Sequence, residues 1–375
     1  MVRSGALSSD WLPTFAAVDR AAFLPDRIWP FDVTRQSSGV LVERATAPDA
    51  WYAAADGDVP IVTQWDDGRH RGDDPGHVAT SSSSMPSVVW SLLRELSVEN
   101  GMKVLDVGTG TGETAGALTH RLGHARVTTV EVDAAVSAHA RERLCRLGLY
   151  PEVVVGDAVE GPLPGGPYDR VLATVGVREV PEAWIGQTRD GAIVLAPWGT
   201  HFTTGDAMVR LSVKGGVASG SFVGLVEFMK LRSQRAPAAR HADCLAAHPF
   251  GEAEISRTEV PEAEFTTGRY TLLPFVLGLR VPRCVRAVAE RRDGRRPVWF
   301  YGLADRSWAC VLFEEGAPEA QVWQAGPRRL WEEVAGAYEW WVARGRPEVT
   351  RFGLTVGPEG PHAWLEDPAA SWPVG

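Results

Sequence analysis

The sequence lacks the features of several protein classes. Its four cysteines, Cys145, Cys244, Cys284 and Cys310, lie far apart and form no C-x-x-C pair, which argues against a disulfide framework and against a zinc site. The N-terminal stretch "MVRSGALSSDWLPTF" has no apolar signal-like run, and no long apolar run follows elsewhere. We therefore expect a protein of the reducing cytoplasm with no membrane partner.

An excess of positive charge is also missing. The chain of 375 residues carries a net charge of −9 at pH 7, whereas a nonspecific nucleic-acid binder is basic, so we expect no nucleic-acid partner. With 45% hydrophobic and 23% charged residues, the composition is that of an ordinary globular protein. A chain of this length can bury a sizeable core and form two or three domains.

Three regions follow one another, and we expect each to be a domain. Residues 1–76 are rich in loop-forming residues, with helical candidates such as "WLPTFAAVDRAAFL", and predict an N-terminal elaboration with a substrate loop. Residues 77–235 alternate strand-like and helix-like segments, which indicates a parallel α/β sheet. The predicted strands are "KVLDV", "RVTTVEV", "EVVVGD", "YDRVLAT" and "AIVLAPWG", and the predicted helices are "ETAGALTHRLG" and "AAVSAHARERLCRLG".

The stretch "SQRAPAARHADCLAAHPFG" breaks that alternation and marks the predicted start of a C-terminal α+β domain, residues 236–375. Here "RPVWFYGLADRSWACVLFEE" and "RFGLTVGPEGPHAWLED" predict hairpins, and "PRRLWEEVAGAYEWWVARG" predicts an amphipathic helix. Eight of the fifteen tryptophans lie in this region: Trp299, Trp308, Trp323, Trp331, Trp340, Trp341, Trp364 and Trp372. We interpret them as a core, with an aromatic groove for a peptide as the alternative.

The most informative motif is "KVLDVGTGTGET", a strand, a glycine-rich turn and a helix. Gly108, Gly110 and Gly112 allow a tight turn and a close approach to a ligand. A dinucleotide fingerprint needs a glycine where this chain has Glu113, and a carboxylate is a poor neighbour for a diphosphate. A sulfonium ligand carries no phosphate and tolerates it, so the motif predicts binding of S-adenosylmethionine.

Two acidic residues at later strand ends agree with that cofactor. Glu131 lies at the carboxyl end of the strand "VTTVEV", where a carboxylate can accept hydrogen bonds from both ribose hydroxyls, and Asp157 falls at the end of the third strand, beside the expected adenine. The residues that we expect to bind the cofactor are Asp106, Gly108, Thr109, Gly110, Thr111, Gly112, Glu131, Val132, Gly156, Asp157 and Ala158.

The region from Ser81 to Gly199 resembles the protein-L-isoaspartate O-methyltransferase family. The similarity lies in "TSSSSMPSVVWSLL", "GMKVLDVGTGTGETAGAL", "VVVGDAVEG" and "PYDRVLATVGVREVPEAW". It implies a Rossmann-like class I methyltransferase fold. It also implies that Ser84, two residues before Pro86, lies beside the methyl-accepting carboxylate as the catalytic serine. Thr80, Ser81, Ser82, Ser83 and Val175 are then the residues expected to bind the substrate.

The chain departs from the shorter repair enzymes of that family. About 140 residues follow the predicted catalytic domain, and the segment "IVTQWDDGRHRGDDPG" is expanded. "TQWDDG", the serine run and the Trp-rich extension are similar to homologues of the graspetide and lanthipeptide type, which methylate an aspartate of a ribosomally made, modified peptide. That second resemblance implies a cyclised precursor peptide as partner, and an ester that collapses to aspartimide or isoaspartate.

The serine run directly precedes a predicted helix that begins near Met85. Free backbone N–H groups at a helix N-terminus, together with serine hydroxyls, can hold a carboxylate without a full positive charge. We therefore predict a mobile substrate loop; in the alternative, Ser84 only caps the helix. The acidic residues of the expanded segment lack metal-ligand spacing, so we expect a solvated lid and no metal. Arg291, Arg292, Arg295 and Arg296 predict a solvated face, or a contact for an acidic peptide.

The sequence thus predicts an S-adenosylmethionine-dependent carboxyl O-methyltransferase. The first hypothesis for its acceptor is an aspartate of a modified, cyclised precursor peptide. The first alternative is an isoaspartyl residue of a damaged protein. The second alternative is a non-catalytic, peptide-binding homologue. The oligomeric state is left open.

Overall fold

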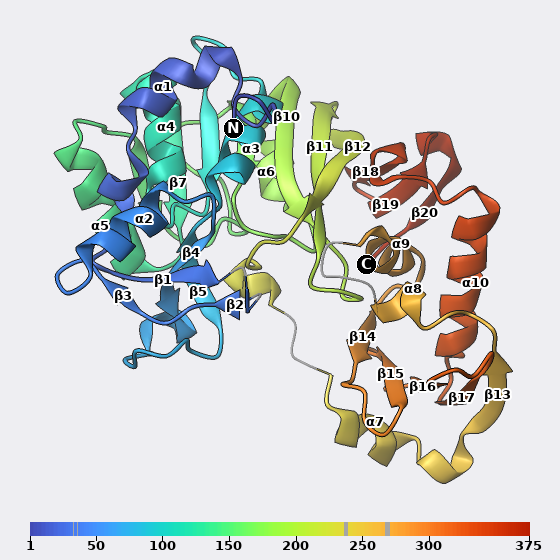
Figure 1. Cartoon of the computed structure of the whole chain (residues 1–375). Coiled ribbons are helices and arrows are strands. Elements are labelled where there is room, and N and C mark those ends of the chain that lie inside the picture. The colour runs from blue at the N-terminus through green and yellow to red at the C-terminus, as the bar shows by residue number, and fades with distance from the viewer. Residues whose placement is uncertain (33, 36, 236–238, 267–270) are drawn as a thin grey trace. The chain divides into compact units, whose positions relative to one another are not determined.

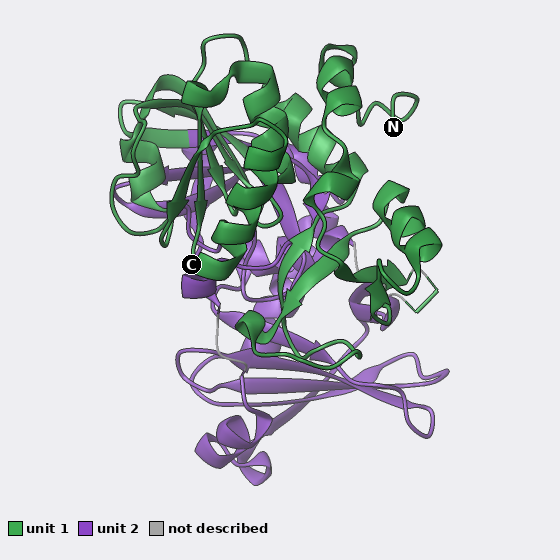
Figure 2. Ribbon diagram, turned by 90° about the vertical axis from the view of Figure 1, so that its left-hand side faces the viewer, with its two compact units in different colours: residues 1–175, 181–196, 210–218 green, residues 176–180, 197–209, 219–375 purple. Residues whose placement is uncertain are grey.

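The computed structural model describes residues 1–375 except 33, 36, 236–238 and 267–270 (Figure 1). The chain forms two compact units (Figure 2). Unit 1 comprises Met1–Val175, Pro181–Ala196 and Arg210–Ala218, and unit 2 comprises Gly176–Val180, Pro197–Val209 and Ser219–Gly375. This division differs from the three predicted domains, because the first 76 residues belong to unit 1 and no division falls at 235.

A parallel sheet forms the centre of unit 1, in the strand order β10-β9-β6-β7-β8. Its strands are β6 (Val104–Val107), β7 (Val127–Glu131), β8 (Glu152–Val155), β9 (Tyr168–Ala173) and β10 (Thr188–Trp198). The helices α4 (Glu113–Leu122) and α5 (Ala134–Arg146) connect successive strands. All five predicted strands and both predicted helices are confirmed. Because the strands are parallel, their carboxyl ends meet at one edge of the sheet, where ligands bind in such folds.

The N-terminal part of unit 1 is not loop-rich, so that prediction is wrong. It contains α1 (Leu12–Ala17), α2 (Pro48–Asp56), α3 (Pro86–Leu96), β1 (Arg27–Asp32), β2 (Ser37–Ser38), β3 (Val42–Glu43), β4 (Ile61–Trp65) and β5 (Ala79–Ser83). The short 3-10 helices are η1 (Ser9–Trp11), η2 (Arg20–Phe23) and η3 (Asp66–Gly68). Trp51 and Ile61 belong to one buried cluster of this region, and Trp29, Val62 and Trp65 form another. These apolar contacts between distant segments hold the strands together.

The remaining elements of residues 77–235 are two short helices of unit 1 and two strands that are divided between the units. They are η4 (His124–Arg126), α6 (Glu182–Gly186), β11 (Asp206–Lys214) and β12 (Val217–Val226). The division between the units falls inside β10, β11 and β12. The sequence analysis predicted neither β11 nor β12.

Unit 2 contains a five-stranded antiparallel sheet in the order β13-β17-β16-β15-β14. Its strands are β13 (Glu254–Thr258), β14 (Cys284–Val288), β15 (Arg295–Gly302), β16 (Trp308–Glu314) and β17 (Ala320–Ala325). The other elements are η5 (Arg232–Gln234), α7 (His241–Ala247), η6 (Phe250–Glu252), α8 (Ala263–Thr266), α9 (Leu272–Arg280), α10 (Leu330–Ala343), η7 (Val349–Arg351), β18 (Phe352–Gly357), β19 (Gly360–Leu365), η8 (Pro368–Ala370) and β20 (Ser371–Pro373). The hairpins β15–β16 and β18–β19 and the helix α10 confirm the predictions.

The tryptophans of the C-terminal region form core contacts. All eight are buried or half-buried, and Trp308, the most enclosed of them, stacks on Phe250. Trp331 packs against Phe265 and Phe300. These contacts favour the interpretation as a core over that of an aromatic groove. Residues 236–238 of the stretch predicted as a domain boundary lie outside the described residues.

Three of the four arginines singled out around the β14–β15 turn form ion pairs with acidic residues. Arg291 and Arg296 both form ion pairs with Glu262, and Arg295 forms one with Glu314. This arrangement favours a solvated, charge-balanced face over a binding site for an acidic peptide. Within the described part of the chain, no helix is both long and apolar enough to cross a membrane.

Candidate functional site

The glycine-rich turn joins β6 to α4 at the carboxyl edge of the parallel sheet. Gly108 has a φ of +95° and Gly110 a φ of +53°, a backbone conformation that residues with a side chain rarely adopt. A Cβ on Gly108 would lie 2.7 Å from Cγ1 of Val175, and one on Gly110 would lie 3.4 Å from the carbonyl oxygen of Ser82. The turn therefore needs glycine for its conformation, and it brings Val175 and the serine segment against the predicted cofactor motif.

Glu131 lies at the carboxyl end of β7, directly beside that turn. Its Oε2 accepts a hydrogen bond from the Gly110 amide at 3.0 Å, and its Oε1 accepts one from the Asp133 amide at 3.1 Å. The two amides fix the orientation of the carboxylate, while each oxygen keeps acceptor capacity for a ligand. Val132, the next residue, is exposed and apolar, which suits contact with a flat ring.

Asp106, the last but one residue of strand β6, is fully buried. Its Oδ2 accepts a hydrogen bond from Thr129 at 2.7 Å, and Thr129 is itself 2.7 Å from the hydroxyl of Thr109. Oδ1 has no hydrogen-bond partner among the described residues. Burial is the main cause that raises the pKa of Asp106 to about 7; the Thr129 hydrogen bond opposes this rise, and the negative charge of Glu131 adds to it.

The segment after β8 contributes backbone groups and one acidic side chain, that of Asp157, to the predicted cofactor site. Asp157 accepts a hydrogen bond from the Val159 amide at 3.0 Å, so its carboxylate shapes the local turn. Gly156 has open space where a side chain would be, and the carbonyl of the buried Ala158 accepts a hydrogen bond from Trp184. Thr111 and Gly112 are buried at the start of α4. The predicted cofactor residues thus lie on three consecutive connections at one sheet edge.

The serine run is a strand, so the predicted mobile loop is wrong. Strand β5 pairs antiparallel with β4 from Ala79 to Ser83. Ser81 and Ser83 are buried, whereas Ser82 and Ser84 are half-buried. The alternation follows from the period of two of a strand, which points successive side chains to opposite faces. The serine-rich composition is typical of a flexible linker. Here, however, pairing with strand β4 satisfies the backbone hydrogen bonds of the segment.

Only two hydroxyls of the run remain available to a ligand. Ser81 accepts a hydrogen bond from Thr63 at 3.3 Å, and Ser83 donates one to Glu113 at 3.0 Å. The hydroxyls of Ser82 and Ser84 have no hydrogen bond to any residue that the structure describes. The candidate catalytic residue Ser84 is therefore free to act on an acceptor group.

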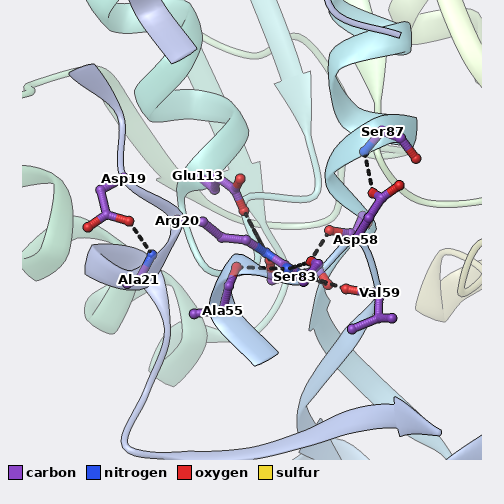
Figure 3. Close-up of polar contacts among 11 residues, drawn as sticks. Asp19, Arg20, Ala21, Ala55, Asp58, Val59, Ser83, Ser87 and Glu113 are labelled. Carbon is purple, nitrogen blue, oxygen red and sulfur yellow. Dashed lines mark hydrogen bonds and ion pairs between the residues drawn. The ribbon is translucent and has the colours of Figure 1, made fainter. Parts of the chain in front are cut away.

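The predicted role of the helix N-terminus is wrong. Helix α3 begins at Pro86 and its N-cap residue is Met85, with no side-chain capping bond, so Ser84 does not cap it. Asp58 accepts the hydrogen bond of the Ser87 amide at 2.8 Å (Figure 3). The next two amides bond to the Met85 carbonyl. Because the first-turn amides already have acceptors, they are not available to hold a substrate carboxylate.

Arg20 is the main residue of the site that the sequence analysis missed. It is 8% exposed, and its guanidinium lies between Ser83, Glu113 and the end of α2 (Figure 3). Nε donates to Ser83 Oγ at 2.8 Å, and Nη2 donates to the carbonyl oxygens of Ser83 and Ser84 at 3.3 and 3.1 Å. Further bonds reach the carbonyls of Ala55, Gly57 and Val59. Arg20 thus ties the serine strand to two other segments.

Glu113 is the anionic partner of this arginine. Its Oε2 lies 3.8 Å from Arg20 Nε, and both side chains are only 8% exposed. Burial raises the pKa of Glu113, while the charge of Arg20 and the hydrogen bond from Ser83 oppose that rise. The sequence singled out Glu113 as an acid unsuited to a diphosphate, and a buried acid calls for a cation. No local pattern identified that cation as Arg20, 93 positions away.

The expanded acidic segment is ordered by hydrogen bonds to its own backbone. Part of it is strand β4, and Asp66 accepts the amides of Val78 and His77 at 2.8 and 3.1 Å. Thr80, a predicted substrate residue, donates to Gln64 at 2.8 Å. Among the described residues, no group of three or more His, Cys, Asp or Glu side chains is arranged to hold a metal. Asp73 and Asp74 of the segment are exposed, as the predicted solvated lid requires, whereas Trp65 of β4 is buried.

Comparison with known proteins agrees with this geometry. Residues 72–235 match the family model described as protein-L-isoaspartate(D-aspartate) O-methyltransferase. A protein-L-isoaspartate O-methyltransferase of Thermococcus onnurineus is 34% identical over 152 residues, which cover 38% of this chain and 69% of that protein. One of Methanococcus maripaludis is 39% identical over 119 residues, covering 31% of this chain and 56% of that protein.

A solved structure named protein-L-isoaspartate O-methyltransferase covers 97% of this chain and 97% of its own, with a TM-score of 0.53 and 19% sequence identity. The fold similarity therefore extends through unit 2. The length of the chain had suggested that a large additional unit distinguishes it from proteins of that name. The similarity over 97% of both chains shows that at least one protein of that name has a fold of similar extent.

The parallel sheet, the glycine-rich turn and the acidic strand ends define a Rossmann-like class I methyltransferase fold with an N-terminal elaboration and an additional α+β part. The chain belongs to the protein-L-isoaspartate O-methyltransferase family. It spans about half the length, 56%, of curated relatives such as the Methanococcus maripaludis protein.

Proposed function

We propose that the protein is an S-adenosylmethionine-dependent O-methyltransferase that esterifies the carboxylate of an isoaspartyl or aspartyl residue in a peptide or protein. The observation that supports it most directly is the approach of strand β5 to the glycine-rich turn. The Ser82 carbonyl lies 3.4 Å from the position of a Cβ on Gly110. The segment expected to bind the acceptor therefore adjoins the segment expected to bind the cofactor.

The residues at the sheet edge fit S-adenosylmethionine. Glu131 offers carboxylate oxygens to hydroxyl groups, Val132 offers an exposed apolar surface, and Gly108 leaves space for close approach. Asp106 has one buried oxygen without a partner among the described residues, which a donor group of a ligand can satisfy. When bound, the cofactor supplies a methyl group activated by a sulfonium.

The protein has to hold the acceptor and remove its water. A carboxylate is ionised at pH 7, so it needs no general base to become a nucleophile. Ser84, with its hydroxyl free and its carbonyl held by Arg20, can donate a hydrogen bond that orients the carboxylate. A hydroxyl does so without the full positive charge that would reduce the nucleophilicity of the anion.

An isoaspartyl acceptor agrees best with the family to which the chain belongs. The narrower hypothesis, an aspartate in a cyclised, ribosomally made peptide, had three supports in the sequence. The Trp-rich extension is one of them, but it packs as a core and has a counterpart in the similar solved structure. The "TQWDDG" segment and the serine run remain. The Ser84 hydroxyl, which has no hydrogen bond to the described residues, argues against a merely non-catalytic peptide binder.

Methyl transfer to a short isoaspartyl peptide tests the proposal. We expect mass spectrometry to show a gain of one methyl group that requires S-adenosylmethionine, followed by loss of methanol. In Glu131→Ala, calorimetry should show cofactor binding weaker by roughly 1–3 kcal/mol, because buried ligand hydroxyls lose their acceptor. A cyclised, aspartate-containing precursor peptide is the parallel substrate. If it alone reacts, the acceptor is the aspartate of a modified peptide, and if neither reacts, the methyltransferase proposal fails.

Replacing Ser84 by alanine should lower kcat/KM for methyl transfer by roughly tenfold or more, the effect of losing one hydrogen bond to a charged group. Cofactor affinity should stay close to that of the parent protein. Ser81→Ala is the matched comparison, since the Ser81 hydroxyl is directed to Thr63 within the fold. Equal losses in the two variants would show that Ser84 has no role distinct from the rest of strand β5.

A further inference from the structure

The "TQWDDG" motif, residues 63–68, orients the side chain of Gln64, which the proposed methyl transfer does not use. Gln64 lies between two irregularities in the pairing of β4 with β5, at which Thr63 and then Thr80 are the additional residues. Bulges of this kind re-aim a side chain and are common beside active sites. The strand pairing thus takes Gln64 out of the ordinary alternation of β4.

Hydrogen bonds within the hairpin decide which end of the Gln64 amide is the donor. The Thr80 hydroxyl accepts a hydrogen bond from the Asp67 amide at 3.2 Å and donates one to Gln64 Oε1 at 2.8 Å. Because Oε1 is the acceptor here, Nε2 is the end that can donate to a further group. Gly68 leaves room for it, since a Cβ at that position would lie 3.1 Å from Nε2.

The acceptor of that donor is Asp133, the residue before α5. Gln64 Nε2 donates to Asp133 Oδ2 at 3.1 Å, while Oδ1 caps α5 by accepting the amides of Ala135 and Val136. The Asp133 amide in turn donates to Glu131 Oε1 at 3.1 Å. Asp133 therefore connects β4 with the carboxylate that we expect to hold the ribose of the cofactor.

The hairpin of β4 and β5 thus adjoins the predicted cofactor site at two places, all within unit 1. Strand β5 approaches the glycine-rich turn, where a Cβ on Gly110 would lie 3.4 Å from the Ser82 carbonyl oxygen. Strand β4 reaches the connection between β7 and α5 through the bond from Gln64 to Asp133. The second link is made by side chains, so substitutions can remove it without changing the glycine-rich turn.

We propose that Gln64 is a positioning residue that couples the acceptor strand β5 to the cofactor site, so that binding at either site strengthens binding at the other. The inference rests on the proposed function, because it takes Glu131 as the cofactor residue and β5 as the acceptor strand. A cofactor bound to Glu131 restrains the connection around Asp133, and the Gln64 amide extends that restraint to the hairpin. Because coupling is reciprocal, peptide and cofactor should raise each other's affinity by the same factor.

Calorimetry of S-adenosylhomocysteine, the demethylated cofactor, with and without a short isoaspartyl peptide measures this coupling. In the parent protein we expect the peptide to tighten binding about fivefold or more. Gln64→Glu places a second carboxylate against that of Asp133, and their repulsion should reduce the factor below about twofold. Gln64→Ala removes the amide altogether, should have the same effect and serves if Gln64→Glu does not fold.

A second substitution tests the hydrogen bond itself. Asp133→Asn keeps an oxygen for the amides that cap α5 but turns an NH₂ group toward the Gln64 amide, so two donors face each other and the coupling should be lost. Combining it with Gln64→Glu restores one donor and one acceptor with their roles reversed, and the coupling should return. A folded double variant without coupling would contradict the proposal.

Thr63→Val is the matched control. It removes another hydrogen bond of the same hairpin, the one from Thr63 to the Ser81 hydroxyl at 3.3 Å, and leaves the link to Asp133 in place. The coupling should therefore equal that of the parent protein. If Thr63→Val lowers it as much as Gln64→Glu does, the effect is a general loosening of the hairpin and the proposal is wrong.

Amide hydrogen exchange supplies a measurement that needs neither peptide nor turnover. S-adenosylhomocysteine should slow exchange in β4 of the parent protein but not in β4 of Gln64→Glu. If the ligand does not bind the parent protein, the proposed function fails, and the coupling that rests on it fails too. If the ligand binds and exchange in β4 is unchanged, the proposed function stands and the role of Gln64 is refuted.

Discussion

Replacing Arg20 by methionine should lower the free energy of unfolding of unit 1 by about 3–5 kcal/mol, the cost of removing one partner from a buried ion pair. The substitution keeps most of the side-chain volume but removes every hydrogen bond that the guanidinium makes. Among the described residues, Glu113 then remains buried with the Ser83 hydroxyl as its hydrogen-bond donor. Methyl transfer should fall as well, because the Ser84 carbonyl loses its anchor.

Urea unfolding followed by tryptophan fluorescence measures this loss. Arg189→Met, which breaks a half-exposed pair with Asp169, should cost less than about 1 kcal/mol. Adding Glu113→Gln to Arg20→Met removes the stranded charge and should recover part of the stability, so the two changes should not be additive. A loss for Arg20→Met as small as that for Arg189→Met would mean that the buried pair contributes no more than a surface pair.

Much of unit 1 could be predicted from the sequence because its signals are local. The strands Val104–Val107 and Val127–Glu131 are short segments rich in β-branched residues, and glycine marks the turn between β6 and α4. Because Glu131 and Asp157 lie at the carboxyl ends of predicted parallel strands, both could be predicted to lie at the same edge of the sheet. The hairpins and helix α10 of unit 2 followed from the same local patterns.

The parts that could not be predicted depend on contacts between distant residues. Strand β5 looks like a linker in the sequence, and only its pairing with β4 makes it a strand. The amide of Ser87 is satisfied by Asp58, 29 positions earlier, so no cap was visible near the helix start. Arg20 is one arginine among many, and its partners lie 35 to 93 positions away in the chain.

The second large effect concerns Asp106 and the dependence of stability on pH. Burial holds its pKa at about 7 in the folded protein, whereas an unfolded aspartate has a pKa of about 4. Between these values the folded state binds more protons than the unfolded state, so stability falls as pH rises from about 4 to about 7 and is then constant. The full difference corresponds to roughly 4 kcal/mol. Asp106→Asn, which keeps an oxygen for the Thr129 hydroxyl, should remove this part of the slope.

The measurement is the free energy of unfolding of Asp106→Asn minus that of the parent protein, taken at each pH from about 2 to 8, so that the range also covers the pH dependence of the control. The new amide group adds a constant offset, so the test is the slope: the difference should rise with pH up to about 7 and then level off. Asp169→Asn is the control of opposite sign. Burial raises the pKa of Asp169, but the Lys103 amide and Arg189 outweigh it and lower the pKa overall. That variant should therefore lose stability at neutral pH, and its deficit should shrink as pH falls below about 4. A difference for Asp106→Asn that is flat across the range would show that Asp106 is ionised throughout, with its buried charge stabilised by groups other than Thr129.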